Sequence, residues 1–122
     1  MSKSEIVLVV DDDPAVRSAL KFALELEGFN VRAYDGPVAL LSETNLPACS
    51  CMIVDYRMPV IDGLELVSTL RGRGVSAPAV IITGRSSRGL QAQAEKIGIH
   101  QVLEKPLADG ALVAAVRSAI GS

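Results

Sequence analysis

Short apolar runs alternate along this chain with segments in which apolar residues recur at every third or fourth position. Each run is short and apolar enough to be a strand covered on both faces. The predicted strands are 6–10, 30–34, 51–54, 79–83 and 99–103. Helical spacing predicts one helix between Pro14 and Gly28 and others at 37–46, 64–71, 87–97 and 108–120. Strands that alternate with helices in this way indicate βα units and a parallel sheet.

Right-handed crossovers leave few ways to connect five such units. We expect an α/β fold of the flavodoxin-like type, a (βα)5 doubly wound three-layer sandwich with a parallel five-stranded sheet in the order 2-1-3-4-5. That order places 6–10 beside 51–54 at the switch point, where ligands bind in such sheets. The helical positions expected to face the core include Ala19, Leu20, Val38, Leu41 and Val116, while the burial of Leu40, Leu90 and Val102 stays open.

Polar residues with useful chemistry follow four of the predicted strands. The Asp11-Asp12-Asp13 cluster follows the first strand, Asp55 the third, Thr83 closes the fourth and Lys105 follows the fifth. The carboxyl ends of parallel strands meet at one edge of a sheet, so these side chains are predicted to form one site.

Composition narrows the possible functions. The 122 residues are 49% hydrophobic and 21% charged, which is ordinary for one soluble globular domain. The net charge of −2, with two tyrosines, two phenylalanines and no tryptophan, argues against direct binding of nucleic acid or an anionic membrane. The run 6–10 is too short for a signal peptide core or a membrane span.

Cysteine usage points to a reducing compartment. Cys49 and Cys51 are too close for an unstrained disulfide and too few for a zinc site. We therefore expect reduced, structural thiols and a cytoplasmic location. The 122 residues form a single domain, which is either a whole protein or the N-terminal part of a longer one.

Three carboxylates at one edge need a counter-ion. Two unit charges about 4 Å apart repel by about 4 kcal/mol at an effective dielectric near 20. Hard oxygen ligands suit Mg²⁺, which also attracts phosphate. Asp55 can then act as a carboxylate nucleophile that forms an acyl phosphate, and Lys105 can pair with the phosphoryl oxygens.

The remaining groups of this site come from the fourth strand and from the loop after Asp55. Thr83 would supply a hydroxyl hydrogen bond, and the loop can point a carbonyl such as that of Arg57 at the metal. Pro59 and Gly63 set the path of this loop. A cis bond between Lys105 and Pro106 would aim the lysine into the crevice.

Each of these residues also has an ordinary structural interpretation. Aspartates before Pro14 cap a helix, and for Asp13 the cap is the better interpretation. Asp55 alone would be a turn residue, Thr83 alone a β-former and Lys105 alone a solvated charge. Their joint occurrence at four strand ends favours a site. His100 is better explained as a polar strand residue than as a phosphotransfer group.

The motifs DD, VDYRMPVIDG, IITG and EKP occur in this order at successive strand ends. With them the chain, from Ile6 to Ile120, resembles the receiver domain of two-component response regulators. The sequences of the loop motif and of IITG are most similar to those of receivers in the nitrogen-fixation regulator group.

The resemblance implies a role for each motif residue. Asp55 would be the phospho-acceptor, and Asp11 and Asp12 the acidic pocket, with Asp12 as the more direct Mg²⁺ ligand. The carbonyl of Arg57 would complete the protein ligands of the metal. Thr83 would be the switch hydroxyl and Lys105 the phosphate-binding lysine.

It also implies a signalling module rather than an enzyme, although one that catalyses its own phosphorylation and dephosphorylation. The phosphoryl group would come from a sensor histidine kinase or a phosphotransfer protein. The face made by 87–97, 99–103 and 108–120 would then repack for a downstream effector or for a phosphorylation-dependent homodimer.

Two residues depart from the family pattern. Val102 stands three residues before the lysine, where most receivers have an aromatic that turns inward with the threonine. Ile99 stands where the family usually has a small alanine. Arg57 and Arg85 flank the pocket, and their long cationic side chains can shield or position an acyl phosphate.

Two other functions stay open. A phosphorylation-independent interaction module fits the missing aromatic at position 102. A haloacid-dehalogenase-like phosphatase also uses an aspartyl nucleophile and Mg²⁺, and Asp11 and Asp13 match its Asp-x-Asp spacing. That family requires Thr or Val at the fifth position, where this chain has Ala15.

Overall fold

In the computed structural model, which describes residues 5–44, 46, 48–108 and 110–121, five parallel strands form one sheet in the order β2-β1-β3-β4-β5. The strands are β1 (Ile6–Val10), β2 (Asn30–Tyr34), β3 (Cys51–Asp55), β4 (Ala79–Thr83) and β5 (Gln101–Glu104). The predicted flavodoxin-like (βα)5 fold and its strand order are confirmed.

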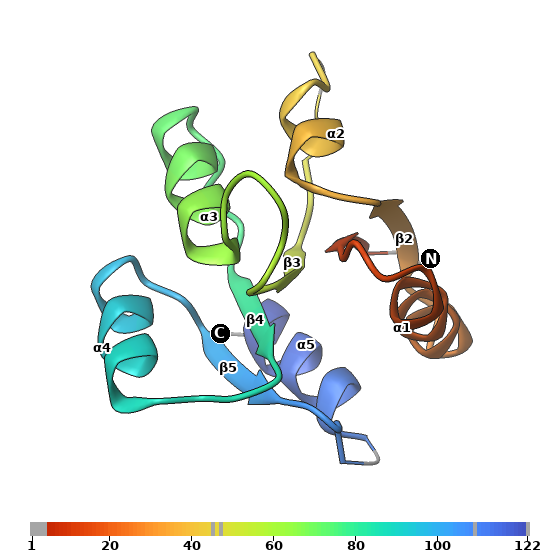
Figure 1. The fold of residues 1–122 in the computed structure, drawn as a ribbon. Coiled ribbons are helices and arrows are strands. Elements are labelled where there is room, and N and C mark those ends of the chain that lie inside the picture. The colour runs from red at the N-terminus through yellow and green to blue at the C-terminus, as the bar shows by residue number, and fades with distance from the viewer. Residues whose placement is uncertain (1–4, 45, 47, 109, 122) are drawn as a thin grey trace.

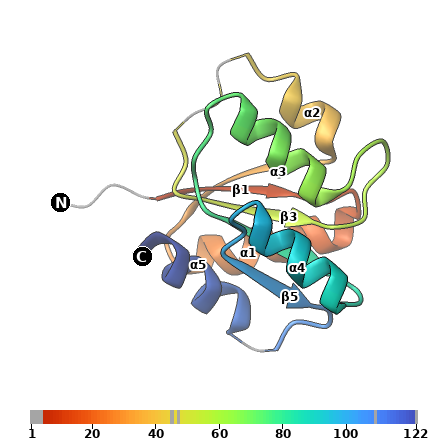
Figure 2. The ribbon, with the colours of Figure 1, turned by 90° about the vertical axis from the view of Figure 1, so that its left-hand side faces the viewer.

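Helices cover both faces of the sheet (Figures 1 and 2). One face packs against α1 (Pro14–Leu26) and α5 (Ala111–Gly121). The other packs against α2 (Pro37–Leu41), α3 (Gly63–Gly72) and α4 (Arg88–Lys96). In β3, Cys51 and Ile53 face the first group of helices and Met52 and Val54 face the second. This two-sided burial explains why the strand is a continuous apolar run rather than an alternating one.

The helix starts follow local capping chemistry. Asp13 accepts hydrogen bonds from the backbone N–H groups of Ala15 (2.9 Å) and Val16 (3.3 Å), which confirms the cap interpretation for this residue. Asp62 and Glu65 form a capping box at the start of α3, with both reciprocal bonds at 2.9 Å.

Three predicted element boundaries are wrong. The helix predicted at 37–46 ends at Leu41, because polar residues follow it and Leu46 reaches the core from outside the helix; Asn45 lies outside the described residues. The helix predicted from Ala108 begins at Ala111, after Gly110 with φ +77°; Asp109 also lies outside the described residues. The last strand begins at Gln101 rather than Ile99, since its pairing with β4 starts there.

Two positions predicted to face the core are exposed instead. Ala19 lies on the outer side of α1, and Val38 is 60% exposed because Leu40 is the residue that fills the core beneath the short α2. Of the positions left open, Leu90 is buried and Val102 is half-buried against the α2–α3–α4 side of the core.

The strand register brings the ends of the central strands level. Val10 pairs with Val54, Asp55 with Ile82, and Thr83 with Glu104. The arrowheads of β1, β3 and β5 therefore point to one edge of the sheet (Figure 2). None of the described helices is long and apolar enough to cross a membrane.

Candidate functional site

Three carboxylates and one ammonium meet at the carboxyl edge of the sheet, and we call Asp11, Asp12, Asp55 and Lys105 the acidic pocket. One carboxylate oxygen from each aspartate lies within 4.8 Å of the other two. The Lys105 Nζ lies 3.3 Å from Asp55 Oδ1 and 3.9 Å from Asp11 Oδ2. The structure thus brings together four residues that the sequence places at the ends of three different strands.

The backbone of Lys105 is tied to the end of β4. Its N–H donates to the Thr83 carbonyl oxygen at 2.8 Å, which extends the pairing of β4 with β5 by one residue. The peptide bond between Lys105 and Pro106 is cis, as the sequence analysis anticipates.

Asp11 is held by hydrogen bonds to its own loop and to the end of β2. Its Oδ1 accepts a hydrogen bond from the Asp13 N–H at 2.9 Å, and its N–H donates to the Tyr34 carbonyl oxygen at 3.2 Å. Its Oδ2 is buried and accepts no hydrogen bond from the described residues. A buried oxygen without a donor carries a large desolvation cost, so this atom fits a cation ligand.

The raised pKa values of two aspartates show that the acidic pocket lacks sufficient positive charge. Burial raises the pKa of Asp55, and the neighbouring Asp11 charge raises it further, while Lys105 lowers it. Burial likewise raises the pKa of Asp11, against the hydrogen bond from Asp13 and the charge of Lys105. One lysine therefore does not offset the cost of holding these carboxylates charged.

Taken together, the donor set fits a divalent cation such as Mg²⁺. Oxygen ligands from Asp11, Asp12 and Asp55 are within reach of one ion, and hard oxygen ligands are what Mg²⁺ prefers. Asp12 is exposed, so water can complete the coordination from the open side.

Thr83 lies at the same edge, but its hydroxyl belongs to its own loop. It is only 2% exposed. The hydroxyl donates to the Arg85 carbonyl oxygen (3.1 Å) and accepts from the Arg85 N–H (3.3 Å). A hydrogen bond from Thr83 to a group on Asp55 would first require this local pair to open.

The loop after Asp55 is pressed against the strand it leaves. The Gly63 N–H donates to the Tyr56 carbonyl oxygen at 2.8 Å, and a Cβ on Gly63 would lie 2.6 Å from the Asp55 carbonyl oxygen. Gly63 is thus required for close approach, rather than for an unusual turn conformation. Val60, at the exposed tip of the loop, has a φ of +79°. The side chain of Arg57 is exposed.

Sequence reasoning missed one residue that contacts the pocket. The Arg17 Nη1 donates to the backbone carbonyl oxygen of Asp11 at 2.8 Å. The available signal was a cation at the fourth position of a helix, directly after three aspartates, where the helix dipole disfavours positive charge.

The other polar candidates have structural roles. His100 precedes β5, and its Nε2 lies 3.1 Å from the Ser118 Oγ on α5. Cys49 and Cys51 are free, and burial raises the pKa of Cys51 to about 12, as expected for an inert thiol. Asp13, the second aspartate of the phosphatase-like spacing, is engaged as a helix cap.

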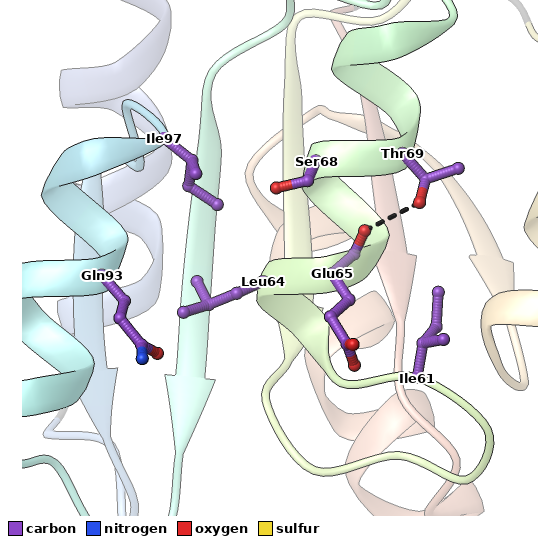
Figure 3. A pocket seen from close by; sticks show the side chains of 7 residues that line it. All are labelled: Ile61, Leu64, Glu65, Ser68, Thr69, Gln93 and Ile97. Atoms are coloured by element: carbon purple, nitrogen blue, oxygen red, sulfur yellow. Dashed lines mark hydrogen bonds between the residues drawn. The ribbon is translucent and has the colours of Figure 1, made fainter.

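A groove of about 410 Å³ between α3 and α4 lies apart from this chemistry (Figure 3). Leu64 lines it from α3 and Ile97 from the C-cap position directly after α4, and the Thr69 hydroxyl donates to the Glu65 carbonyl oxygen on its α3 side. The acidic pocket and Thr83 do not line it.

Residues 7–117 match the response regulator receiver domain family. The chain is 40% identical over 121 residues to the transcriptional regulatory protein FixJ of Azorhizobium caulinodans, a match that covers 99% of this chain and 57% of that protein. It is 37% identical over 114 residues to FixJ of Bradyrhizobium diazoefficiens, with 93% and 56% covered. These matches agree with the resemblance to the nitrogen-fixation regulator group.

The crystal structure of FixJ-N has the same fold, with a TM-score of 0.88 and 29% identity over 98% of this chain and 96% of that one. The chain spans a little over half the length of the FixJ proteins that it matches.

Proposed function

The chain belongs to the response regulator receiver domain family, and from this premise we propose that it accepts a phosphoryl group on Asp55 from a phosphohistidine. The donor would be a sensor histidine kinase or a phosphotransfer protein. The observation that carries the proposal is the buried Asp55 carboxylate, 3.3 Å from the Lys105 ammonium and within 4.8 Å of two further carboxylates. The 122 residues act as one receiver domain of a two-component system.

The chemical step is an in-line displacement at phosphorus. A carboxylate oxygen of Asp55 attacks the phosphorus atom, the O–P bond forms, and the N–P bond to the donor imidazole breaks with its electron pair on nitrogen. Lys105, already beside Asp55, pairs with the phosphoryl oxygens as a point charge. The product is an aspartyl phosphate.

The acidic pocket would hold Mg²⁺ through Asp11, Asp12 and Asp55, together with the backbone carbonyl of Arg57. When bound, Mg²⁺ neutralises the carboxylates and the incoming phosphoryl oxygens. Asp11 would contribute the buried Oδ2, to which none of the residues that the structure describes donates a hydrogen bond.

The module is not an enzyme in the usual sense, because its product is its own modified side chain. It catalyses its own phosphorylation and, by attack of water on the acyl phosphate, its own dephosphorylation. Arg57 and Arg85, which are exposed and follow Asp55 and Thr83 by two residues, would screen that water with their long side chains. Its free thiols suit the reducing conditions of the cytoplasm.

The signal would leave through Thr83 and the α4–β5–α5 face. Phosphorylation draws the Thr83 hydroxyl from Arg85 to the phosphoryl group, and the loop between β4 and α4 moves with it. A downstream effector, or a second phosphorylated copy, would bind the repacked face. The domain itself binds neither nucleic acid nor membrane.

The test is intact mass after incubation with Mg²⁺ and acetyl phosphate, for the wild type and for Asp55→Asn. The expected result is a gain of one phosphoryl group in the wild type alone, and none in EDTA. A wild type that binds Mg²⁺ yet gains no mass would refute the phospho-acceptor role.

A second function, a phosphorylation-independent interaction module, is favoured by one observation. Val102 is only half-buried and lacks the ring that would follow Thr83 inward. Backbone amide spectra with beryllofluoride separate the two functions. Shifts in α4 and β5 support the switch, whereas shifts confined to the acidic pocket support the independent module.

A further inference from the structure

We propose that Arg17 is a positioning residue for the cation ligands of the acidic pocket, acting through the backbone of Asp11. This inference rests on the proposed function, because it assigns a residue that tunes the affinity of that same site for a divalent cation. Arg17 does not touch the ligand oxygens; it holds the loop that presents them.

The contacts around Asp11 show what Arg17 contributes. The Asp11 side chain is tied to the loop through Oδ1 and the Asp13 N–H, and its backbone N–H is tied to β2 through Tyr34. Its carbonyl oxygen is held by the Arg17 Nη1 at 2.8 Å. With these three groups fixed, Oδ2 is the oxygen of Asp11 to which no described residue donates a hydrogen bond, and it lies 3.9 Å from the Lys105 Nζ in the pocket.

Arg17 also closes the loop from the helix side. Its own backbone N–H donates to the Asp13 carbonyl oxygen at 2.9 Å, as the first turn of α1 requires. The side chain then reaches back over six positions to Asp11. One residue therefore links the end of β1, the cap at Asp13 and the first turn of α1.

The position of Arg17 is unfavourable for the helix alone. It is the fourth residue of α1, and the one acidic side chain that the structure places at this helix end is that of the N-cap Asp13, which bonds the helix N–H groups rather than Arg17. A cation near a helix N-terminus opposes the macrodipole. Arg17 is a partly buried residue, and its 2.8 Å bond to the Asp11 carbonyl oxygen indicates that a gain in the loop compensates for this cost.

A positioning role and a purely electrostatic role of Arg17 predict opposite changes in metal affinity when its side chain is removed. As a nearby cation, Arg17 repels a divalent ion, so its removal would strengthen metal binding. As the support of the Asp11 backbone, it preorganises the ligands, so its removal weakens metal binding. A measurement of affinity therefore separates the two roles by direction.

The experiment measures binding of Mn²⁺ to the unphosphorylated chain, with free Mn²⁺ counted by electron paramagnetic resonance and Mg²⁺ added as a competitor. Arg17→Met keeps the aliphatic stem without a donor, and Arg17→Ala is the second variant. Lys21→Ala is the matched control, because Lys21 is a cation on the same helix that pairs with Glu25 (3.0 Å) away from the pocket.

The expected result is about tenfold weaker Mn²⁺ binding for both Arg17 variants, or ~1.4 kcal/mol, and no change for Lys21→Ala. Faster hydrogen exchange at the Asp13 amide should accompany the loss.

Arg17→Met that stays folded by circular dichroism and binds Mn²⁺ as tightly as the wild type, or more tightly, overturns the proposal. Failure of the proposed function has a different signature. In that case the wild type binds Mn²⁺ but takes up no phosphoryl group, and the comparison of Arg17→Met with the wild type still decides the role of Arg17.

Discussion

At the ends of β1, β3 and β5 the fold itself brings the acidic pocket together, whereas the Thr83 hydroxyl on β4 is hydrogen-bonded within its own loop. Asp55 and Asp11 already lie 3.3 and 3.9 Å from Lys105. The Thr83 hydroxyl is paired with Arg85, and Val102 is a small side chain half-buried on the α2–α3–α4 side of the sheet. We call Thr83, Arg85 and Val102 the switch region.

The difference follows from how each region is positioned. The acidic pocket depends on strand register and on backbone hydrogen bonds, which a folded parallel sheet provides without further change. The switch region depends on the rotamer of one side chain and on a loop bond that must be exchanged. If the proposed function holds, the phosphoryl transfer uses groups that the fold has preorganised, while the signal requires a conformational step.

The largest expected effect comes from removing the one cation inside the acidic pocket. Lys105→Met should slow phosphorylation by acetyl phosphate about 100-fold, because a preorganised charge on the transferred group is lost. Time-resolved intact mass measures the rate. Lys96→Met, at an exposed lysine in the last turn of α4, is the matched control and should leave the rate unchanged. A loss of less than threefold for Lys105→Met would show that the lysine does not contact the reacting group.

Gly63→Ala should destabilise the fold, because its side chain would clash with the backbone of Asp55. The new Cβ would lie 2.6 Å from the Asp55 carbonyl oxygen, which is fixed in β3 and cannot yield. We expect a loss of about 2 kcal/mol in the free energy of unfolding, typical of an overpacked site. Urea denaturation measures it. Gly72→Ala is the control, since a Cβ there meets nothing within 4 Å; equal stabilities for the two variants would contradict the close approach.

The features that the sequence could predict are those that depend on strand order and backbone pairing, as the acidic pocket does. Strands such as Cys51–Asp55 were predicted to within one residue, because burial on both faces leaves an uninterrupted apolar run. The gathering of Asp11, Asp55 and Lys105 followed from strand order alone. Both depend on topology, which periodicity and crossover handedness determine well.

Features that depend on single side-chain packing could not be predicted. Val38 has the same helical spacing as Leu41, yet Leu40 occupies the core and Val38 is exposed. The bond from Thr83 to Arg85 and the reach of Arg17 to Asp11 depend on rotamers. The start of α5 depends on the backbone at Gly110, where a positive φ delays the helix.

A smaller effect should appear in the pH dependence of stability. Burial and the Asp11 charge raise the pKa of Asp55 in the folded state, so ionised Asp55 lowers the free energy of unfolding. This loss of stability is absent below the unfolded-state pKa of 3.8, and it develops as the pH rises through the folded-state pKa. Without divalent cations, Asp55→Asn should therefore raise Tm at pH 7 by about 3 °C, with little difference near pH 4. Thermal melts in EDTA across this range measure the difference.

Mg²⁺ sharpens the same test. Added Mg²⁺ at pH 7 should raise the Tm of the wild type and raise that of Asp55→Asn less, because the variant offers one carboxylate fewer. If the Tm of Asp55→Asn exceeds that of the wild type most near pH 4, or if Mg²⁺ raises the Tm of both proteins equally, then the ionised Asp55 carboxylate does not destabilise the acidic pocket.

The smallest expected effect tests whether the two regions are separable. Val102→Tyr adds the missing aromatic side chain on β5. Because position 102 is only half-buried, the larger ring can extend into solvent. We expect the phosphorylation rate to stay within about twofold and stability within about 0.5 kcal/mol, as for other partly exposed substitutions. The beryllofluoride-induced amide shifts in α4 should grow, because a ring can follow Thr83 inward where valine cannot. A changed phosphorylation rate with unchanged α4 shifts would instead mean that position 102 acts on the acidic pocket, and that chemistry and signal are not divided between the two regions.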